Sequence, residues 1–281
     1  MKKKTVIFMS GSGTNAEALL EYSRKNDCGF EVSALFTDRP DRCRAFEIGR
    51  KFNCEVLSYD IFEYYKVHGE AGIGLINARR NQLRDQWTFE VEKVIDRAGY
   101  RPDFLLLAGF EPLSNITKDF VTLNVHPGDL TVERNGKRFL NGLALKPLEL
   151  AILEKFPYLK SSVIIAQPYT GRDEDVDSGP ILGISKPMPI DFMGHSLEEL
   201  RAANAARPAK RPKNHIDILH EVANHNQDLL KKAGDHVIFP QAADDYAKGF
   251  FEIKDGRTFF KGEPVKTVEY GTNSKVPIPE D

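Results

Sequence analysis

The segment Leu123-Asn-Val-His-Pro127 carries the residue types best suited to chemistry in this sequence. It has the pattern of a strand that stops at a proline, and alternation along a strand puts Asn124 and His126 on one face. At the carboxyl end of a parallel strand, where open α/β sheets bind ligands, an asparagine amide can donate to a developing oxyanion. Histidine readily transfers protons near neutral pH. Asn124 and His126 are therefore candidate catalytic residues, although a single histidine is more often structural.

An acidic run, Asp173-Glu-Asp-Val-Asp177, precedes the apolar segment Ile181–Ser185. Aspartates at alternate positions are typical of a calcium loop, but Ser178 and Ile184 stand where that loop requires glycine and glutamate. Two interpretations stay open. The run can be a charged surface loop that leads into a strand. Alternatively, Asp177 faces the same crevice as His126, where a carboxylate could move a proton through water.

The glycine-containing segment Ser10-Gly-Ser-Gly-Thr-Asn15 lies between an apolar run and a helical pattern. Glycines let the backbone turn tightly against a ligand, and a helix N-terminus attracts anions, most often phosphate. Gly11, Gly13 and Ala16 also match the G-x-G-x-x-A pattern of dinucleotide sites, with Asp38 placed where a ribose-binding acid would stand. A nicotinamide-dependent oxidoreductase is therefore a rival interpretation, and a plain turn is a third. A P-loop is excluded, because no Gly-Lys-Ser/Thr follows.

The elements that must hold these residues alternate between short apolar runs and amphipathic stretches. The apolar runs predict strands at Thr5–Met9, Phe30–Thr37, Cys54–Leu57, Asp103–Leu107, Val121–Val125, Ser162–Ala166 and Ile181–Ser185. Helical spacing predicts helices at 14–25, 41–52, 83–98 and 142–155. This alternation predicts an α/β fold with a doubly wound, mostly parallel, Rossmann-like sheet.

The pattern changes after residue 190, so we expect three units, over residues 1–190, 191–234 and 235–281. The first is the α/β domain and the second a polar helical insertion. The insertion contains the basic stretch Arg201–Lys213, interpreted as a solvated face, with polyanion binding as the alternative. The third is expected to hold a helix, a hairpin over 249–261 and a loose tail from Ser274, all packed on the first.

The composition is that of an ordinary globular protein. Among 281 residues, 39 Lys and Arg balance 41 Asp and Glu, which gives no electrostatic reason for the whole molecule to bind nucleic acid or anionic membranes. The three cysteines form no C-x-x-C pair, so we expect a reducing compartment, taken as the cytoplasm, and no metal site. The apolar run Thr5–Met9 is too short for a signal peptide, and no run could span a membrane.

Taken together, four segments resemble the folate-dependent formyltransferases. These are VIFMSGSGTN near the start, LLLAGF at 105–110, LNVHP at 123–127 and DVDSGPIL at 175–182. The resemblance covers roughly residues 4–190 and resumes at Asp235-His-Val-Ile-Phe-Pro240. It implies a formyltransferase fold, 10-formyltetrahydrofolate as co-substrate and a primary amine as acceptor.

The resemblance also implies a role for individual residues. Asn124 would bond the formyl oxygen, protonated His126 would stabilise the oxyanion, and Asp177 would orient His126 and help move the amine proton. The acceptor would be a small phosphorylated molecule, with glycinamide ribonucleotide as the leading candidate. It would contact Gly13, Thr14, Asn15, Arg84 and Asp235. The folate would contact Phe110, Leu113 and Val176.

The sequence departs from the family pattern at two loops, 111–114 and 128–140, the second with the unusual run ERNGKRF at 133–139. Other acceptors therefore stay open, namely an amino sugar or an aminoacyl-tRNA. In the second case the basic stretch over 201–213 would bind the tRNA phosphates. A formate-releasing hydrolase, an oxidoreductase and a non-catalytic binder are further alternatives. We expect small-molecule substrates, no membrane partner, nucleic acid only in the tRNA case, and a homodimer as one option.

Overall fold

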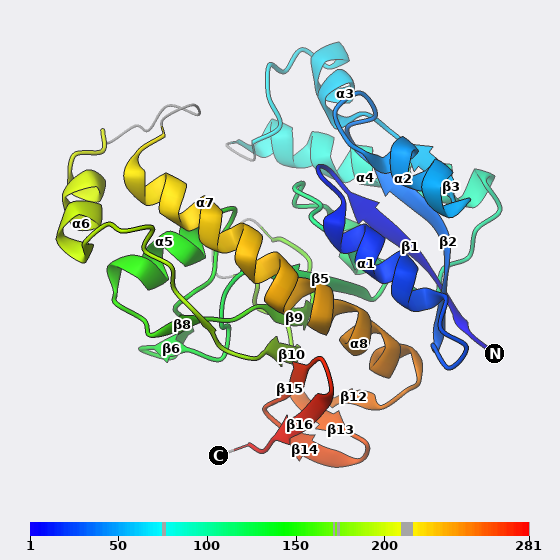
Figure 1. Ribbon diagram of the computed structural model, residues 1–281. Coiled ribbons are helices and arrows are strands. Elements are labelled where there is room, and N and C mark those ends of the chain that lie inside the picture. Colours follow the sequence, from blue (N-terminus) through cyan, green and yellow to red (C-terminus); the bar gives the residue numbers. More distant parts are fainter. Residues whose placement is uncertain (75–76, 171, 173–174, 209–215, 281) are drawn as a thin grey trace.

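The computed structural model describes residues 1–74, 77–170, 172, 175–208 and 216–280 (Figure 1). Within these residues, the largest sheet has nine strands in the order β16-β15-β10-β9-β5-β4-β1-β2-β3. The strands are β1 (Lys3–Met9), β2 (Phe30–Thr37), β3 (Glu55–Ser58), β4 (Phe104–Leu107), β5 (Thr122–His126), β9 (Ser162–Ile165), β10 (Ile181–Ser185), β15 (Thr267–Gly271) and β16 (Ser274–Ile278).

The half of the sheet that contains β1 is fully parallel. β1 pairs with β2 on one side and β4 on the other, while β3 and β5 extend the sheet outward in the same direction. The strand order therefore reverses between β1 and β4, and ligands bind at such switch points in open α/β sheets. Beyond β5 the direction changes, because β9 runs antiparallel to both β5 and β10. The predicted doubly wound, mostly parallel α/β sheet is confirmed.

Helices cover both faces of this sheet (Figure 1). They are α1 (Thr14–Ser23), α2 (Ala45–Phe52), α3 (Ile61–Val67), α4 (Ala78–Arg97), α5 (Lys146–Leu153), α6 (Leu197–Ala205), α7 (Ile218–Leu230) and α8 (His236–Ala247). A short 3₁₀ turn, η1 (Asn115–Lys118), precedes β5, and a π-helical turn, η3 (Lys231–Asp235), joins α7 to α8. The other strands form small antiparallel sheets: β6 (Glu133–Arg134) with β7 (Lys137–Arg138), β8 (Tyr158–Leu159) with β11 (Met188–Pro189), and β12 (Phe251–Lys254), β13 (Arg257–Phe260) and β14 (Glu263–Val265).

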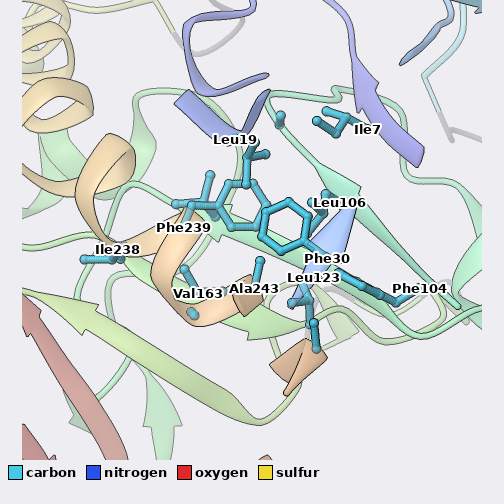
Figure 2. Packing of buried hydrophobic residues seen from close by; sticks show 14 of the residues in the cluster. Ile7, Leu19, Phe30, Phe104, Leu106, Leu123, Val163, Ile238, Phe239 and Ala243 are labelled. Atoms are coloured by element: carbon cyan, nitrogen blue, oxygen red, sulfur yellow. The ribbon is translucent and has the colours of Figure 1, made fainter. Parts of the chain in front are cut away.

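Alternation along β1 supplies the two main hydrophobic cores. Ile7 and Met9 face the core that α1, α2 and α8 close, and Figure 2 shows part of this packing around Leu19, Phe30 and Phe239. Val6 and Phe8 face the opposite core, which α3 and α4 close. A strand buried on both faces is continuously apolar, which is why these strands could be recognised in the sequence.

The segment over 191–234 has a core of its own rather than an entirely polar character. Leu200 of α6 and Leu219 and Val222 of α7 are fully buried with Leu148 of α5. The loop residue Leu140 belongs to the same cluster. The three-unit division stays a prediction. In the fold, α7, η3 and α8 follow one another directly over residues 218–247, so the expected boundary at 234 lies inside this run.

Several local expectations need correction. The tail from Ser274 is not loose, because residues 274–278 pair antiparallel with β15 as the edge strand β16. Its Lys and Pro residues are typical of an edge strand, and they hid it in the sequence. Helix α4 begins at Ala78 rather than at 83, where Asn77 caps it by accepting from the Arg80 N–H. Helix α5 begins at Lys146 rather than at 142.

The hairpin over 249–261 is confirmed as β12 and β13. Residues 209–213 of the basic stretch and residues 173–174 of the acidic run lie outside the described residues. None of the helices in the described part of the chain is both long and apolar enough to cross a membrane.

Leu123 of β5 tests this packing. It is fully buried with residues of the first core, so Leu123→Ala should lower the free energy of unfolding by roughly 2–5 kcal/mol. Val121 lies two residues earlier and is 41% exposed, so Val121→Ala should cost less than about 1 kcal/mol. Urea unfolding followed by circular dichroism measures both, and equal losses would contradict the deep burial assigned to Leu123.

Candidate active site

The site begins at the carboxyl end of β5. The strand forms because Leu123 and Val125 bury their side chains in the first core, and it ends where Pro127 removes a backbone donor. Asn124 and His126 therefore point to the opposite face. Asn124 is half-buried, and no described residue hydrogen-bonds its side chain. His126 is only 3% exposed.

His126 lies between two hydrogen-bond acceptors. Its Nδ1 is 3.2 Å from Asp177 Oδ2, and its Nε2 is 2.8 Å from the Leu140 carbonyl oxygen. A neutral imidazole carries one N–H and can satisfy only one of these acceptors, whereas the imidazolium donates to both. The two contacts therefore hold the ring in a fixed orientation. Such a group is suited to stabilising a developing oxyanion.

The Leu140 carbonyl reaches His126 because Gly128 leaves space for it. A Cβ at Gly128 would lie 2.7 Å from His126 Nε2 and would overlap the Leu140 oxygen. Ser162, the partner of His126 across the β5–β9 ladder, fixes this turn by donating to the Gly128 oxygen at 2.7 Å. The loop over 128–140 therefore closes directly on the imidazole.

A cavity of about 510 Å³ ends beside Asp177. It is lined by Leu113 and Val176, and by Gly142, whose N–H donates to Asp177 Oδ2 at 3.1 Å. This volume is in the range of small-molecule sites. Two of the three residues that the resemblance assigns to folate thus share one cavity. The third, Phe110, packs its ring on Phe8 and Trp87 at centroid distances of 5.2 and 6.3 Å.

Arg84 lines the same cavity. It is 3% exposed and donates to the carbonyl oxygens of Leu113 and Ile73 at 2.6 and 2.8 Å. Its Nε is buried without a partner, and no carboxylate of the described residues lies within ion-pair distance. Burial lowers the pKa of Arg84, because desolvation disfavours the charged form. The structure thus places this cation beside the predicted folate residues and not with Asn15 and Asp235.

The glycine loop after β1 lies on the adjoining edge of the sheet. Gly13 has φ +69° and caps α1, and a Cβ there would overlap the side chains of Met9 and Ile48. Thr14 starts the helix and is partly exposed, so the first N–H groups of α1 follow this turn. Arg44 lies nearby, where its Nη1 donates to the Ser12 oxygen at 2.9 Å and its guanidinium also pairs with Glu47. The arrangement is suited to an anion.

Asn15 and Asp235, which are 220 residues apart in the sequence, contact each other directly. Asn15 Nδ2 donates to Asp235 Oδ2 at 3.0 Å, and Ser161 Oγ donates to Asp235 Oδ1 at 2.5 Å. Burial raises the pKa of Asp235, against the two hydrogen bonds, which lower it. Asn15 Oδ1 is buried without a partner. Ser161 precedes Ser162, which pairs with His126, so this cluster lies close to the imidazole along the sheet edge.

Asp38 directly follows β2 on the same edge and is fully buried. Ser10 Oγ donates to its Oδ1 at 2.6 Å, and Arg39 lies 3.7 Å from its Oδ2. Burial raises the pKa of Asp38 to about 6, because its effect outweighs the opposing effects of the Ser10 hydrogen bond and of Arg39. Ser10 also accepts the Glu111 N–H at 3.0 Å, so this pair links the turns after β1, β2 and β4.

Sequence reasoning missed three contributors to the site, namely Arg138, the Leu140 carbonyl and Ser161. The unusual run over 133–139 marked the segment that contains the first of them. Gly128, which lies in the divergent loop 128–140, was the available signal for the close approach of Leu140. Nothing in the sequence signalled Ser161, because a serine at the start of a strand has no distinguishing pattern.

Comparisons with known proteins place the fold among solved structures. No protein-family model matches the chain, and no curated protein is a significant match. The phosphoribosylglycinamide formyltransferase PurN of Coxiella burnetii superposes with a TM-score of 0.60 at 18% identity, covering 94% of this chain and 96% of that chain. Glycinamide ribonucleotide transformylase 1 of Symbiobacterium toebii superposes with a TM-score of 0.59 at 20% identity, covering 92% of this chain and 94% of that chain.

A formyltetrahydrofolate deformylase of Pseudomonas putida is also similar, with a TM-score of 0.52 at 16% identity, covering 92% of this chain and 70% of that chain. At sequence identities this low, the superpositions establish a common fold and nothing beyond it. The chain therefore has the fold of the folate-dependent formyltransferases, as its four sequence segments predicted.

Proposed function

We propose that this protein transfers a formyl group from 10-formyltetrahydrofolate to the primary amine of a phosphorylated small acceptor, with glycinamide ribonucleotide first. The contact of His126 with Asp177, beside the unpartnered Asn124 on the same strand face, carries this proposal. Asn124 and His126 share one strand, whereas Asp177 comes from a distant loop, and the three meet at the edge where α/β sheets bind ligands. A purely structural histidine would not account for the neighbouring free amide.

In the proposed reaction, the acceptor amine attacks the formyl carbon and the carbonyl becomes a tetrahedral oxyanion. The Asn124 amide and the His126 imidazolium stabilise that charge. The bond from the formyl carbon to N10 of the folate then breaks. The amine loses its extra proton through Asp177 and water, and N10 gains one, so protons and electrons balance. For His126 to donate to the oxyanion directly, its Nε2–H must leave the Leu140 carbonyl.

The surroundings supply a place for each substrate. The cavity lined by Leu113 and Val176 suits the folate, and the buried charge of Arg84 suits a carboxylate of its glutamyl tail. The turn at Gly13 suits the acceptor phosphate. Asn15 and Asp235, with one acceptor oxygen unpartnered, suit hydroxyl or amine groups of the acceptor. We accordingly assign Arg84 to the donor rather than to the acceptor phosphate.

Release of formate to water is the second candidate function. A deformylase has the same fold, and a water molecule could replace the amine as nucleophile at the same dyad. The oxidoreductase alternative is disfavoured by Asp38. A ribose-binding acid must reach the cofactor, whereas Asp38 is fully buried and bonded to Ser10.

Variants of the dyad and of Asn124 test the chemistry. Asn124→Ala should reduce kcat about 10²- to 10³-fold, because it removes an oxyanion donor. Asp177→Asn keeps the shape of the side chain but removes the charge that faces His126, so we expect a comparable loss. Ser178→Ala is the control, because Ser178 is exposed and bonds only the Asp175 oxygen. The loss of absorbance of 10-formyltetrahydrofolate measures the rate, and wild-type rates in either variant would remove that residue from the mechanism.

A panel of acceptors tests the substrate. Turnover with glycinamide ribonucleotide, amino sugars and an aminoacyl-tRNA should be compared with turnover in the absence of an acceptor. We expect turnover only with the ribonucleotide, because the anion site and the Asn15–Asp235 cluster match its phosphate and its polar groups. Formate production at the same rate with no acceptor present would instead identify a hydrolase.

The buried state of Asp38 predicts a pH dependence of stability. Its pKa is about 6 in the fold and 3.8 when unperturbed, so the folded state retains the proton that the unfolded state loses. The contribution of Asp38 to the free energy of unfolding is therefore greatest below about pH 4, and it falls by up to about 3 kcal/mol as the pH rises through 6. Asp38→Asn should remove this fall. Exposed Asp41→Asn should retain it, and a wild-type slope in Asp38→Asn by urea unfolding would show that Asp38 is not protonated in the fold.

A further inference from the structure

The run over 133–139 that departs from the family pattern leads directly into the catalytic dyad. Strands β6 and β7 form a short exposed hairpin there, and residues 138–142, here called the clamp segment, return from it to the site. The clamp segment makes contact at three points. The Leu140 oxygen accepts from His126, the Gly142 N–H donates to Asp177 Oδ2, and the Arg138 guanidinium reaches the backbone around Asp177.

Arg138 uses both terminal nitrogens on this backbone. Nη1 donates to the Asp177 carbonyl oxygen, and Nη2 donates to the Gly179 carbonyl oxygen at 2.7 Å. Two carbonyls two residues apart match the planar fork of a guanidinium, which a lysine ammonium cannot reproduce. Burial lowers the pKa of Arg138, against the attraction of the nearby Asp177 charge. The side chain is thus committed to this turn and is not a free surface cation.

The turn that Arg138 holds has a conformation that needs support. Asp177 has φ +56°, in the left-handed region that non-glycine residues seldom adopt. Gly179 lies so close to β9 that a Cβ would overlap the Ile165 oxygen. The left-handed backbone at Asp177 directs its carboxylate toward His126 Nδ1. A relaxed turn would move that carboxylate away from the ring.

From these contacts we infer that Arg138 is a positioning residue for the dyad. It binds the Asp177 and Gly179 carbonyls, holds the left-handed turn, and so keeps the Asp177 carboxylate on His126 Nδ1. Its side chain faces this backbone and needs no contact with substrate. The kinetic consequence rests on the proposed function, whereas the geometric consequence does not.

The first experiment tests the geometry without an activity assay. Arg138→Ala and Arg138→Lys would be compared with wild type by long-range ¹H–¹⁵N spectra of protein labelled at histidine, with His126→Gln used for assignment. We expect the hydrogen-bonded Nδ1–H signal of His126 to be lost in Arg138→Ala and weakened in Arg138→Lys, because the lysine ammonium lacks the planar fork that spans both carbonyls. Arg134→Ala is the matched control. Arg134 lies in the same hairpin but pairs with Glu154 at 2.9 Å and stacks on Phe139.

The second experiment measures turnover of the same proteins. Arg138→Ala should lower kcat by about 10- to 100-fold with little change in either KM, since a displaced carboxylate weakens chemistry rather than binding. Arg138→Lys should fall between Arg138→Ala and wild type. An unchanged His126 signal in both Arg138 variants would overturn the assignment, whatever the rate. A lost signal with an unchanged rate would support the positioning role and instead contradict the proposed function of the dyad.

Discussion

The whole site depends on one imidazole held between a carboxylate and a backbone carbonyl. Asp177 faces Nδ1 of His126 and the Leu140 oxygen faces Nε2, so the orientation of the ring is fixed. Neither acceptor is near His126 in the sequence. The strands and loops around β5 can therefore be understood as the means of bringing these two oxygens to the same side chain.

Packing connects this interaction to the rest of the molecule. Leu123 and Val125 fix β5 in the first core, which leaves Asn124 and His126 on the opposite face of the strand. Leu140 is 2% exposed, and its side chain packs with α5, α6 and α7 in the third core. The helices of 191–234 thus anchor the carbonyl that caps His126. Helices that are remote in sequence support the geometry of the dyad in this way.

Local patterns were enough to predict the strands of the parallel half, although helix α3 was not predicted. The pairing of His126 with Asp177 was one of two interpretations of the residues, and it was the one that the family resemblance implied. Leu123–Pro127 could be recognised because a buried parallel strand is continuously apolar and a proline ends it. Position in space could not be predicted. The resemblance assigned Arg84 to the acceptor, and the sequence did not indicate that the fold of α4 would place it in one cavity with Leu113 and Val176. Likewise, the hydrogen bond from Arg138 to the Asp177 carbonyl oxygen joins residues that are 39 positions apart in the sequence, and no periodicity encodes such a contact.

The central claim is that this dyad and Asn124 receive the formyl group of a folate. A crystal structure with a stable 10-formyl folate analogue tests it most directly. We expect the folate in the cavity lined by Leu113 and Val176, and its formyl oxygen within hydrogen-bonding distance of the Asn124 amide and of His126 Nε2 after displacement of the Leu140 carbonyl. An analogue bound elsewhere, with the hydrogen bond from His126 to Leu140 intact, would contradict the account.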